Sequence, residues 1–226
     1  MLGRPSGRPP VAATNSSKPI LNHRSERCSV VLIGSSTGGP NALFDIFSSI
    51  PASFPLPILI VQHMPQMFTQ MLAERLNRAS GLNIQEATDG AQIRPGHVWV
   101  APGGKHMSVV GTLANPTIAI TDEAPENSCK PSVDRLFRSA ANVYGNEALA
   151  VVLTGMGTDG ALGCGALKSR GAKVIAQDRE SCIVWGMPRA VFEAGHADRV
   201  APLSEIPALI AQSVAGSSKT PSIVAQ

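Results

Sequence analysis

The sequence lacks the signatures of membrane, metal-binding and secreted proteins. No apolar run reaches the ~18 residues that a membrane-spanning helix needs, and the N-terminus has no apolar signal-peptide core. The four cysteines form no C-x-x-C pair and no zinc-type spacing. We therefore expect reduced thiols in a cytosolic protein without membrane insertion. No cluster of His, Asp or Glu has metal-ligand spacing, so the sequence predicts no metal.

Charge is scarce as well. Charged residues make up 15% of the 226 residues, and the formal net charge is +3. Residues 1–27 hold five basic residues and one acidic residue, which leaves a net charge of −1 on the rest. Since the basic excess lies in this N-terminal stretch, it gives no case for nucleic-acid binding. Few charges with many small apolar residues are typical of a buried parallel sheet in one domain.

Composition divides the chain into three parts. Residues 1–27 are rich in Pro, Ser, Gly and Arg, which predicts a disordered basic linker or tail. Acid-poor starts of this kind also resemble organelle transit peptides, but the prolines in the segment prevent an amphipathic helix. We expect residues 28–214 to form the folded domain and residues 215–226 a loose C-terminal tail.

Within the folded part, apolar runs alternate with helix-like segments. The three strongest buried strands are predicted at Val30–Ile33, Pro57–Val61 and Leu149–Leu153. Between residues 82 and 121 the pattern changes to short strands separated by Pro and Gly turns, at His97–Ala101, Met107–Val110 and Thr117–Thr121. The predicted fold is α/β, with a doubly wound, mostly parallel sheet, helices on both faces and an antiparallel hairpin insert or edge.

The turn after the first strand contains a candidate nucleophile. Gly34-Ser35-Ser36-Thr37-Gly38 matches G-x-S-x-G, the pattern of a serine on a sharp strand-to-helix turn. Pro40 suits the first turn of the following helix, whose N-terminal amides are able to stabilise an oxyanion. The alternative is an ordinary turn that uses Ser, Thr and Gly for their backbone preferences.

Two further side chains follow buried strands, His63 and Asp159. Parallel strands present their carboxyl ends at one edge of a sheet, where ligands bind, so we expect both residues to lie near Ser36. A histidine can accept the serine proton, and a buried carboxylate can fix the histidine tautomer. Taken alone, His63 also suits a core histidine, and Asp159 suits the N-cap of the next helix.

Two other functions agree with parts of the sequence. A nucleotide-binding protein would use the glycine-rich loops Gly34–Gly39 and Gly155–Gly160 for phosphates, but neither loop contains a lysine or arginine. A non-catalytic binding domain would keep the fold only as a scaffold. Both readings rank below a serine hydrolase.

Six segments in order resemble the catalytic domain of the chemotaxis protein-glutamate methylesterases of the CheB type. They are IGSSTGGP, VQHMP, DGAQIRPGHVWVAPGGKHM, PSVDRLFRSAA, LTGMGTDGALG and GMPRAV, and the similarity runs from about Val30 to about Ile210. The resemblance places Ser36, His63 and Asp159 on the nucleophile, base and orienting acid. It implies a carboxylic ester hydrolase that removes methyl groups from glutamate γ-methyl esters of chemoreceptors and deamidates receptor glutamines.

The resemblance also implies partners, and the sequence differs from the usual family pattern in one respect. The expected partners are the cytoplasmic helices of methyl-accepting chemotaxis receptors, with no cofactor, in the adaptation step of chemosensory signalling. Relatives usually carry an N-terminal receiver domain, whereas a short basic tail precedes the catalytic region here, so the chain is a stand-alone esterase or a fragment. For the oxyanion we expect the backbone amide of Thr37, which follows the nucleophile, and as a weaker candidate that of Met156.

Overall fold

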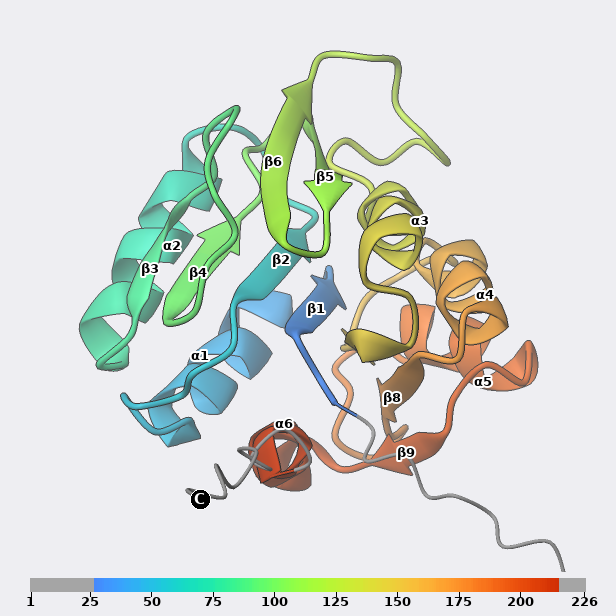
Figure 1. The fold of residues 1–226 in the computed structure, drawn as a ribbon. Helices are drawn as coiled ribbons and strands as arrows, with labels where there is room; N and C mark the ends of the chain where they lie inside the picture. The colour runs from blue at the N-terminus through green and yellow to red at the C-terminus, as the bar shows by residue number, and fades with distance from the viewer. Residues whose placement is uncertain (1–26, 216–226) are drawn as a thin grey trace, which may run out of the picture.

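Seven parallel strands form the centre of the fold, in the order β3-β4-β2-β1-β7-β8-β9 (Figure 1). The structure is a computed structural model that describes residues 27–215. The strands of this sheet are β1 (Val30–Ser35), β2 (Ile58–Gln62), β3 (Asn83–Glu86), β4 (His97–Val100), β7 (Ala148–Val152), β8 (Lys173–Gln177) and β9 (Arg199–Ala201). Two more strands, β5 (His106–Thr112) and β6 (Asn115–Thr121), form an antiparallel hairpin beside the sheet.

Within residues 27–215, six α-helices cover the two faces of the sheet (Figure 1). One hydrophobic cluster joins one sheet face to α1, α2 and α6, and a second joins the opposite face to α3, α4, α5 and the β5–β6 hairpin. The helices are α1 (Gly39–Ser49), α2 (Phe68–Ala79), α3 (Val133–Tyr144), α4 (Ala161–Ser169), α5 (Met187–Glu193) and α6 (Ile206–Ala215). The predicted doubly wound α/β fold is confirmed.

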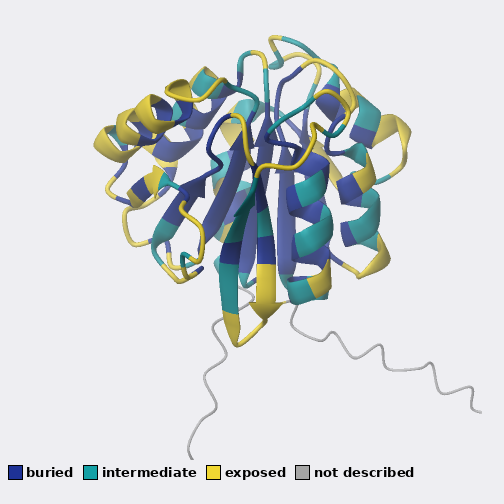
Figure 2. Ribbon diagram, turned by 90° about the horizontal axis from the view of Figure 1, so that it is seen from above, coloured by how far each residue is buried: buried dark blue, intermediate teal, exposed yellow. Residues whose placement is uncertain are grey.

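Strand periodicity explains why the central strands are apolar without interruption. Successive side chains of a strand point to opposite faces. Val31 and Ile33 of β1 therefore pack with α1, whereas Val30 and Leu32 pack with α3. Both faces are covered, so every residue of β1 is buried, as the dark strands in Figure 2 show. A strand of this kind cannot carry the polar alternation of a half-exposed sheet.

The strands between residues 82 and 121 belong to two sheets, which differs in part from the prediction. The hairpin of β5 and β6 is antiparallel, as expected. The prediction that His97–Ala101 is a strand of an antiparallel hairpin is wrong. This strand, β4, lies inside the main sheet, where it pairs in parallel with β2 and β3. The turns on both sides of this short strand gave it the appearance of a hairpin arm, although its apolar residues fill a position between two strands. The predicted tails, apart from Arg27 and Ala215, lie outside the described residues.

The chain reverses its direction of winding at β1. From β1 the chain passes through α1 to β2 on one side, while β7 lies on the other side of β1 and leads into α4 on the opposite face. In open α/β sheets, ligands bind beyond the carboxyl ends of the strands at such a point. Among residues 27–215, no helix is long and apolar enough to cross a membrane.

Candidate active site

The carboxyl ends of β1 and β2 place two of the predicted residues side by side. Ser35 and Gln62 are partners at the ends of these parallel strands, and the His63 amide donates a hydrogen bond of 3.0 Å to the Ser35 carbonyl. Ser36 directly follows β1, and His63 directly follows β2. Since neighbouring strands lie about 4.8 Å apart, Ser36 and His63 start from adjacent backbone positions at the predicted edge.

The loop after β7 closes against the same serine. The Ser36 amide donates to the Thr154 carbonyl at 3.0 Å. A Cβ atom added to Gly155 would lie 2.7 Å from the Ser36 Cβ, closer than real side-chain carbons approach. Glycine at position 155 therefore allows the β7 loop to pack directly on the candidate nucleophile.

Buried polar side chains tie these loops together, and the sequence interpretation missed them. The Ser35 hydroxyl donates to Gln62 Oε1 at 2.7 Å, and Gln62 Nε2 donates to the Ser36 carbonyl at 2.9 Å. The Thr154 hydroxyl donates to the Thr37 carbonyl at 2.9 Å, and Gln177 Oε1 accepts from the Thr154 amide at 2.8 Å. An amide side chain directly after an apolar run, as in Ile58–Gln62, is the signal that could have identified Gln62.

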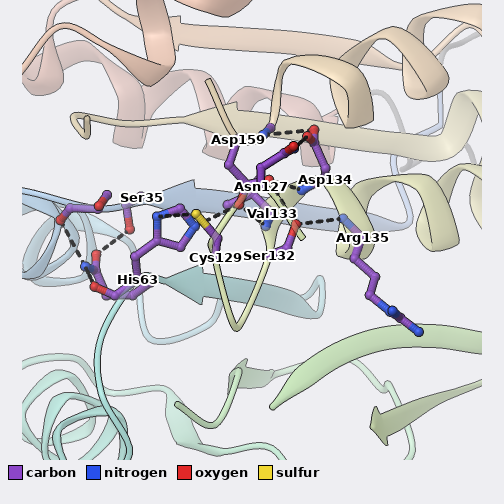
Figure 3. Close-up of polar contacts among 12 residues, drawn as sticks. Ser35, His63, Asn127, Cys129, Ser132, Val133, Asp134, Arg135 and Asp159 are labelled. Carbon is purple, nitrogen blue, oxygen red and sulfur yellow. Dashed lines mark hydrogen bonds and ion pairs between the residues drawn. The ribbon is translucent and has the colours of Figure 1, made fainter. Parts of the chain in front are cut away.

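His63 and Asp159 are in direct contact, as predicted. His63 Nε2 lies 2.8 Å from Asp159 Oδ2, and the Asp159 carboxylate is buried (Figure 3). The same carboxylate accepts the amides of Val133 and Asp134, at 2.7 and 2.9 Å, and the Ser132 hydroxyl at 2.9 Å. The alternative role of Asp159 as N-cap of the following helix is wrong, because its carboxylate caps α3 while Gly160 is the N-cap of α4.

These contacts determine which histidine nitrogen carries the proton. Burial by itself would raise the Asp159 pKa, but the hydrogen bonds from His63 and from the Val133 and Asp134 amides lower it below its usual value. An ionised carboxylate only accepts hydrogen bonds, so His63 Nε2 is the donor. In neutral imidazole the other nitrogen, Nδ1, then holds a lone pair and is able to accept a proton.

A second buried carboxylate, that of Asp134, binds the chain directly after Asp159. Asp134 Oδ1 accepts the amides of Gly160 and Gly163 at 2.9 and 2.7 Å, at the start of α4. Asp159, from the loop before α4, accepts the first amides of α3, and Asp134, in the first turn of α3, accepts amides at the start of α4. Each helix is therefore capped by a carboxylate from the N-terminal region of the other. We infer that this reciprocal capping holds the Asp159 carboxylate in register with His63. The sequence interpretation assigned Asp134 no role, since an acidic residue in a first helical turn is common.

Stability should depend on pH through Asp134. Burial, opposed by the Gly163 amide and assisted by the Asp159 charge, raises the pKa of Asp134 from 3.8 to about 6. The native state then keeps this proton between those values while the unfolded chain has lost it, so the free energy of unfolding falls as pH rises through this window. In Asp134→Asn, chemical denaturation at a series of pH values should show this contribution missing.

The alanine variant is the control for the helix cap. Asp134→Ala leaves the Gly160 and Gly163 amides without their acceptor and should destabilise the domain at every pH by about 1–3 kcal/mol. Asparagine retains an oxygen that can accept both amides. An identical pH slope in wild type and Asp134→Asn would contradict the raised pKa of this carboxyl.

Cys129 also lies at the site, although no motif or spacing in the sequence points to it. Its Sγ lies 3.9 Å from His63 Nδ1, across 66 positions of the chain (Figure 3). Burial first, and then the charges of Asp159 and Asp134, raise the pKa of this thiol to about 11. Cys129 is therefore a neutral thiol near neutral pH, unlike a nucleophilic cysteine.

No contact in the structure tests the two expected oxyanion donors, the amides of Thr37 and Met156. Within residues 27–215, the Ser36 hydroxyl makes no hydrogen bond to another side chain. Thr37 is exposed and directly follows Ser36, while Met156 follows Gly155, which packs against Ser36, and is 72% exposed. Both amides stay predictions.

A family model described as CheB methylesterase matches residues 31–210. The chain belongs to the CheB methylesterase family. The match includes all three predicted catalytic positions and every strand of the main sheet after the first residue of β1. Membership agrees with the resemblance found from the six sequence segments.

Named relatives and a solved structure give the same picture. The chain is 48% identical over 182 residues to the protein-glutamate methylesterase/protein-glutamine glutaminase of Desulfotalea psychrophila, covering 80% of this chain and 50% of that protein. It is 47% identical over 177 residues to the Trichodesmium erythraeum protein of the same name, covering 78% and 50%. The crystal structure of the Thermotoga maritima CheB methylesterase catalytic domain has a TM-score of 0.80 at 42% identity, covering 82% of this chain and 98% of that domain. The chain thus spans about half the length of the curated relatives it matches.

Proposed function

We propose that residues 28–214 form a serine hydrolase domain that demethylates glutamate γ-methyl esters of chemotaxis receptors and deamidates receptor glutamines. The observation that carries this proposal is the 2.8 Å contact of His63 Nε2 with Asp159, beside the neighbouring strand end that bears Ser36. That contact leaves Nδ1 as the proton acceptor. Family membership supplies the substrate class, because the named relatives are protein-glutamate methylesterases.

In the proposed first step, Ser36 Oγ attacks the ester carbonyl carbon and its proton passes to His63 Nδ1. The negative charge moves to the carbonyl oxygen, where the backbone amide of Thr37, with that of Met156 as the weaker candidate, stabilises it. Collapse of this intermediate breaks the bond to the methoxy oxygen, and Nδ1 returns the proton to form methanol. Asp159 keeps the ring oriented and stabilises the imidazolium.

Water completes the cycle. His63 Nδ1 takes a proton from water, and the hydroxide formed attacks the Ser36 acyl group. Collapse then breaks the bond between the acyl carbon and Ser36 Oγ, and Nδ1 returns its proton to Oγ. The glutamic acid side chain that is released loses its proton to solvent as the carboxylate. A glutamine side chain forms the same acyl intermediate on Ser36, with ammonia as the leaving group in place of methanol. One site therefore accounts for both reactions in the names of the relatives.

The position of the site suits a protein substrate. Thr37 is exposed, and the side chain of His63 is 15% exposed beside an open cavity of about 510 Å³ that it shares with Met64 and Cys129. A shallow site of this kind can receive one side chain from the surface of a helix. We therefore propose the cytoplasmic helices of methyl-accepting receptors as partners, in the cytoplasm, with control by a receiver domain where one is joined to this domain.

The test is release of methanol from receptor membranes that carry radiolabelled methyl esters. The full chain should release labelled methanol at a rate proportional to enzyme concentration. Free glutamate γ-methyl ester should react far more slowly, because it lacks the remote contacts that position a receptor helix. Folded protein that leaves the receptor methyl esters intact would overturn the proposed function.

A further inference from the structure

The imidazole and thiol beside the active-site cavity form a pair of metal-binding donors. Sequence spacing predicted no metal cluster, yet the fold brings His63, Cys129 and Asp159 together with their ligand atoms within 4.8 Å of one another. The Asp159 carboxylate accepts the hydrogen bond of His63 Nε2, and Cys129 Sγ lies 3.9 Å from the other nitrogen of that imidazole, Nδ1 (Figure 3). The two donors that face each other are thus Nδ1 and Sγ.

Their separation is close to that of a zinc site. Zinc binds histidine nitrogen at about 2.0–2.1 Å and cysteine sulfur at about 2.3 Å, and a tetrahedral angle then places the two donors about 3.5 Å apart. The observed 3.9 Å needs a contraction of a few tenths of an ångström. Cys129 is on the segment that precedes α3, and its side chain is partly exposed, so a small rotation provides this contraction.

Asp159 prepares the ring for a metal as well as for catalysis. Histidine ligands of metals usually donate their other N–H to a carboxylate, which fixes the tautomer and makes the binding nitrogen more basic. Asp159 makes this contact at 2.8 Å. The buried Asp159 carboxylate also places a negative charge against the ring, which favours a cation on its opposite nitrogen.

Both donors are reachable from solvent. The cavity of about 510 Å³ is lined by His63 and Cys129, and its only charged lining residue is Lys130, which is ion-paired with Asp122. The cavity has room for an ion with two water ligands. Imidazole and thiolate together select zinc and similar soft divalent ions over magnesium or calcium.

We propose that His63 Nδ1 and Cys129 Sγ form an inhibitory site for Zn²⁺ or a similar soft divalent cation. On binding, the Cys129 thiol gives its proton to solvent, its sulfur and the Nδ1 lone pair bond to the metal, and two waters complete a tetrahedron. A metal on Nδ1 occupies the lone pair that would take the Ser36 proton. The inhibition rests on the proposed function, whereas the binding site itself does not.

Binding is tested without any measurement of activity. Titration of the full chain with Co²⁺ should produce the near-ultraviolet absorption of a cobalt–thiolate bond at one equivalent. This band should be absent in Cys129→Ser and strongly weakened in His63→Ala. Cys182→Ser is the matched control, because Cys182 is also partly exposed but lines a different cavity that contains no histidine, and it should keep the band. A missing band in wild type, or an unchanged one in Cys129→Ser, overturns the site.

Inhibition is then measured with buffered Zn²⁺, each variant being compared with its own metal-free rate of methanol release. Zinc should inhibit wild type and Cys182→Ser alike, with recovery on addition of a chelator. Cys129→Ser should need at least roughly tenfold more zinc for half-inhibition, as expected for the loss of one protein ligand. Equal sensitivity of Cys129→Ser and wild type overturns the proposal. If no protein releases methanol, the proposed function fails while the cobalt spectrum still decides the metal site.

Discussion

Replacing Ser36 by alanine is expected to lower kcat for receptor demethylation by several orders of magnitude while the fold persists. The hydroxyl is the atom proposed to attack the ester, and no other group in the site replaces it when it is removed. Ser36 is only partly buried, and its contacts to Thr154, Gly39 and Gln62 involve backbone atoms that alanine keeps. Methanol release under saturating receptor, with the thermal unfolding of both proteins, measures this effect.

The neighbouring serine provides a matched control. Ser35 is fully buried, and its hydroxyl donates to Gln62 Oε1. Ser35→Ala removes one hydrogen bond and should reduce kcat by less than roughly tenfold. If the two variants lost activity in the opposite order, the nucleophile would have to be Ser35.

Replacing Asp159 by asparagine is expected to reduce kcat on the order of 10⁴-fold. Each oxygen of the Asp159 carboxylate accepts two hydrogen bonds. Oδ2 accepts from His63 Nε2 and the Val133 amide, and Oδ1 accepts from the Ser132 hydroxyl and the Asp134 amide. An asparagine NH₂ group must therefore face a donor wherever it points. Placed opposite His63, it favours the tautomer with a proton on Nδ1, which cannot accept the Ser36 proton.

The same substitution should also cost stability, so activity and folding must be separated. If the asparagine NH₂ group faces a backbone N–H, both donors stay unpaired in the interior, which lowers the free energy of unfolding by about 1–3 kcal/mol. Measuring kcat well below the midpoint of unfolding, where the variant is fully folded, isolates the catalytic effect. Asp134→Ala, which removes the acceptor of the Gly160 and Gly163 amides, shows how much activity is lost through helix capping alone. An Asp159→Asn protein with kcat within tenfold of wild type would contradict the role given to this carboxylate.

Local patterns in the sequence predicted the sheet and the positions of the three catalytic candidates. Each candidate follows a continuous apolar run, and such runs form parallel strands whose ends share an edge. The 2.8 Å contact between His63 and Asp159 agrees with that expectation across 96 positions of the chain. β4 was assigned to a hairpin because turn residues flank it on both sides, and nothing local shows that it pairs with β2 and β3.

The supporting contacts could not be predicted in the same way. Asp134 accepts the amide of Gly160, the N-cap of α4, 26 residues later, and Cys129 contacts a histidine 66 residues earlier. Neither pair has a spacing or period that a helix or strand would impose. Such contacts depend on how α3 and α4 pack side by side on one face of the sheet (Figure 1). Residue types alone also assign Asp159 to the wrong helix cap, since an aspartate before a helix usually caps that helix.

The central claim is that Asp159 holds the proton on His63 Nε2, so that Nδ1 is the base for Ser36. Nitrogen-15 NMR of the imidazole rings tests it most directly, with the His63 signals identified by their loss in His63→Ala. In the neutral ring, the account predicts a protonated Nε2 and an unprotonated Nδ1. A neutral His63 with its proton on Nδ1 would contradict it, because that ring could neither donate to Asp159 nor accept the Ser36 proton in this geometry.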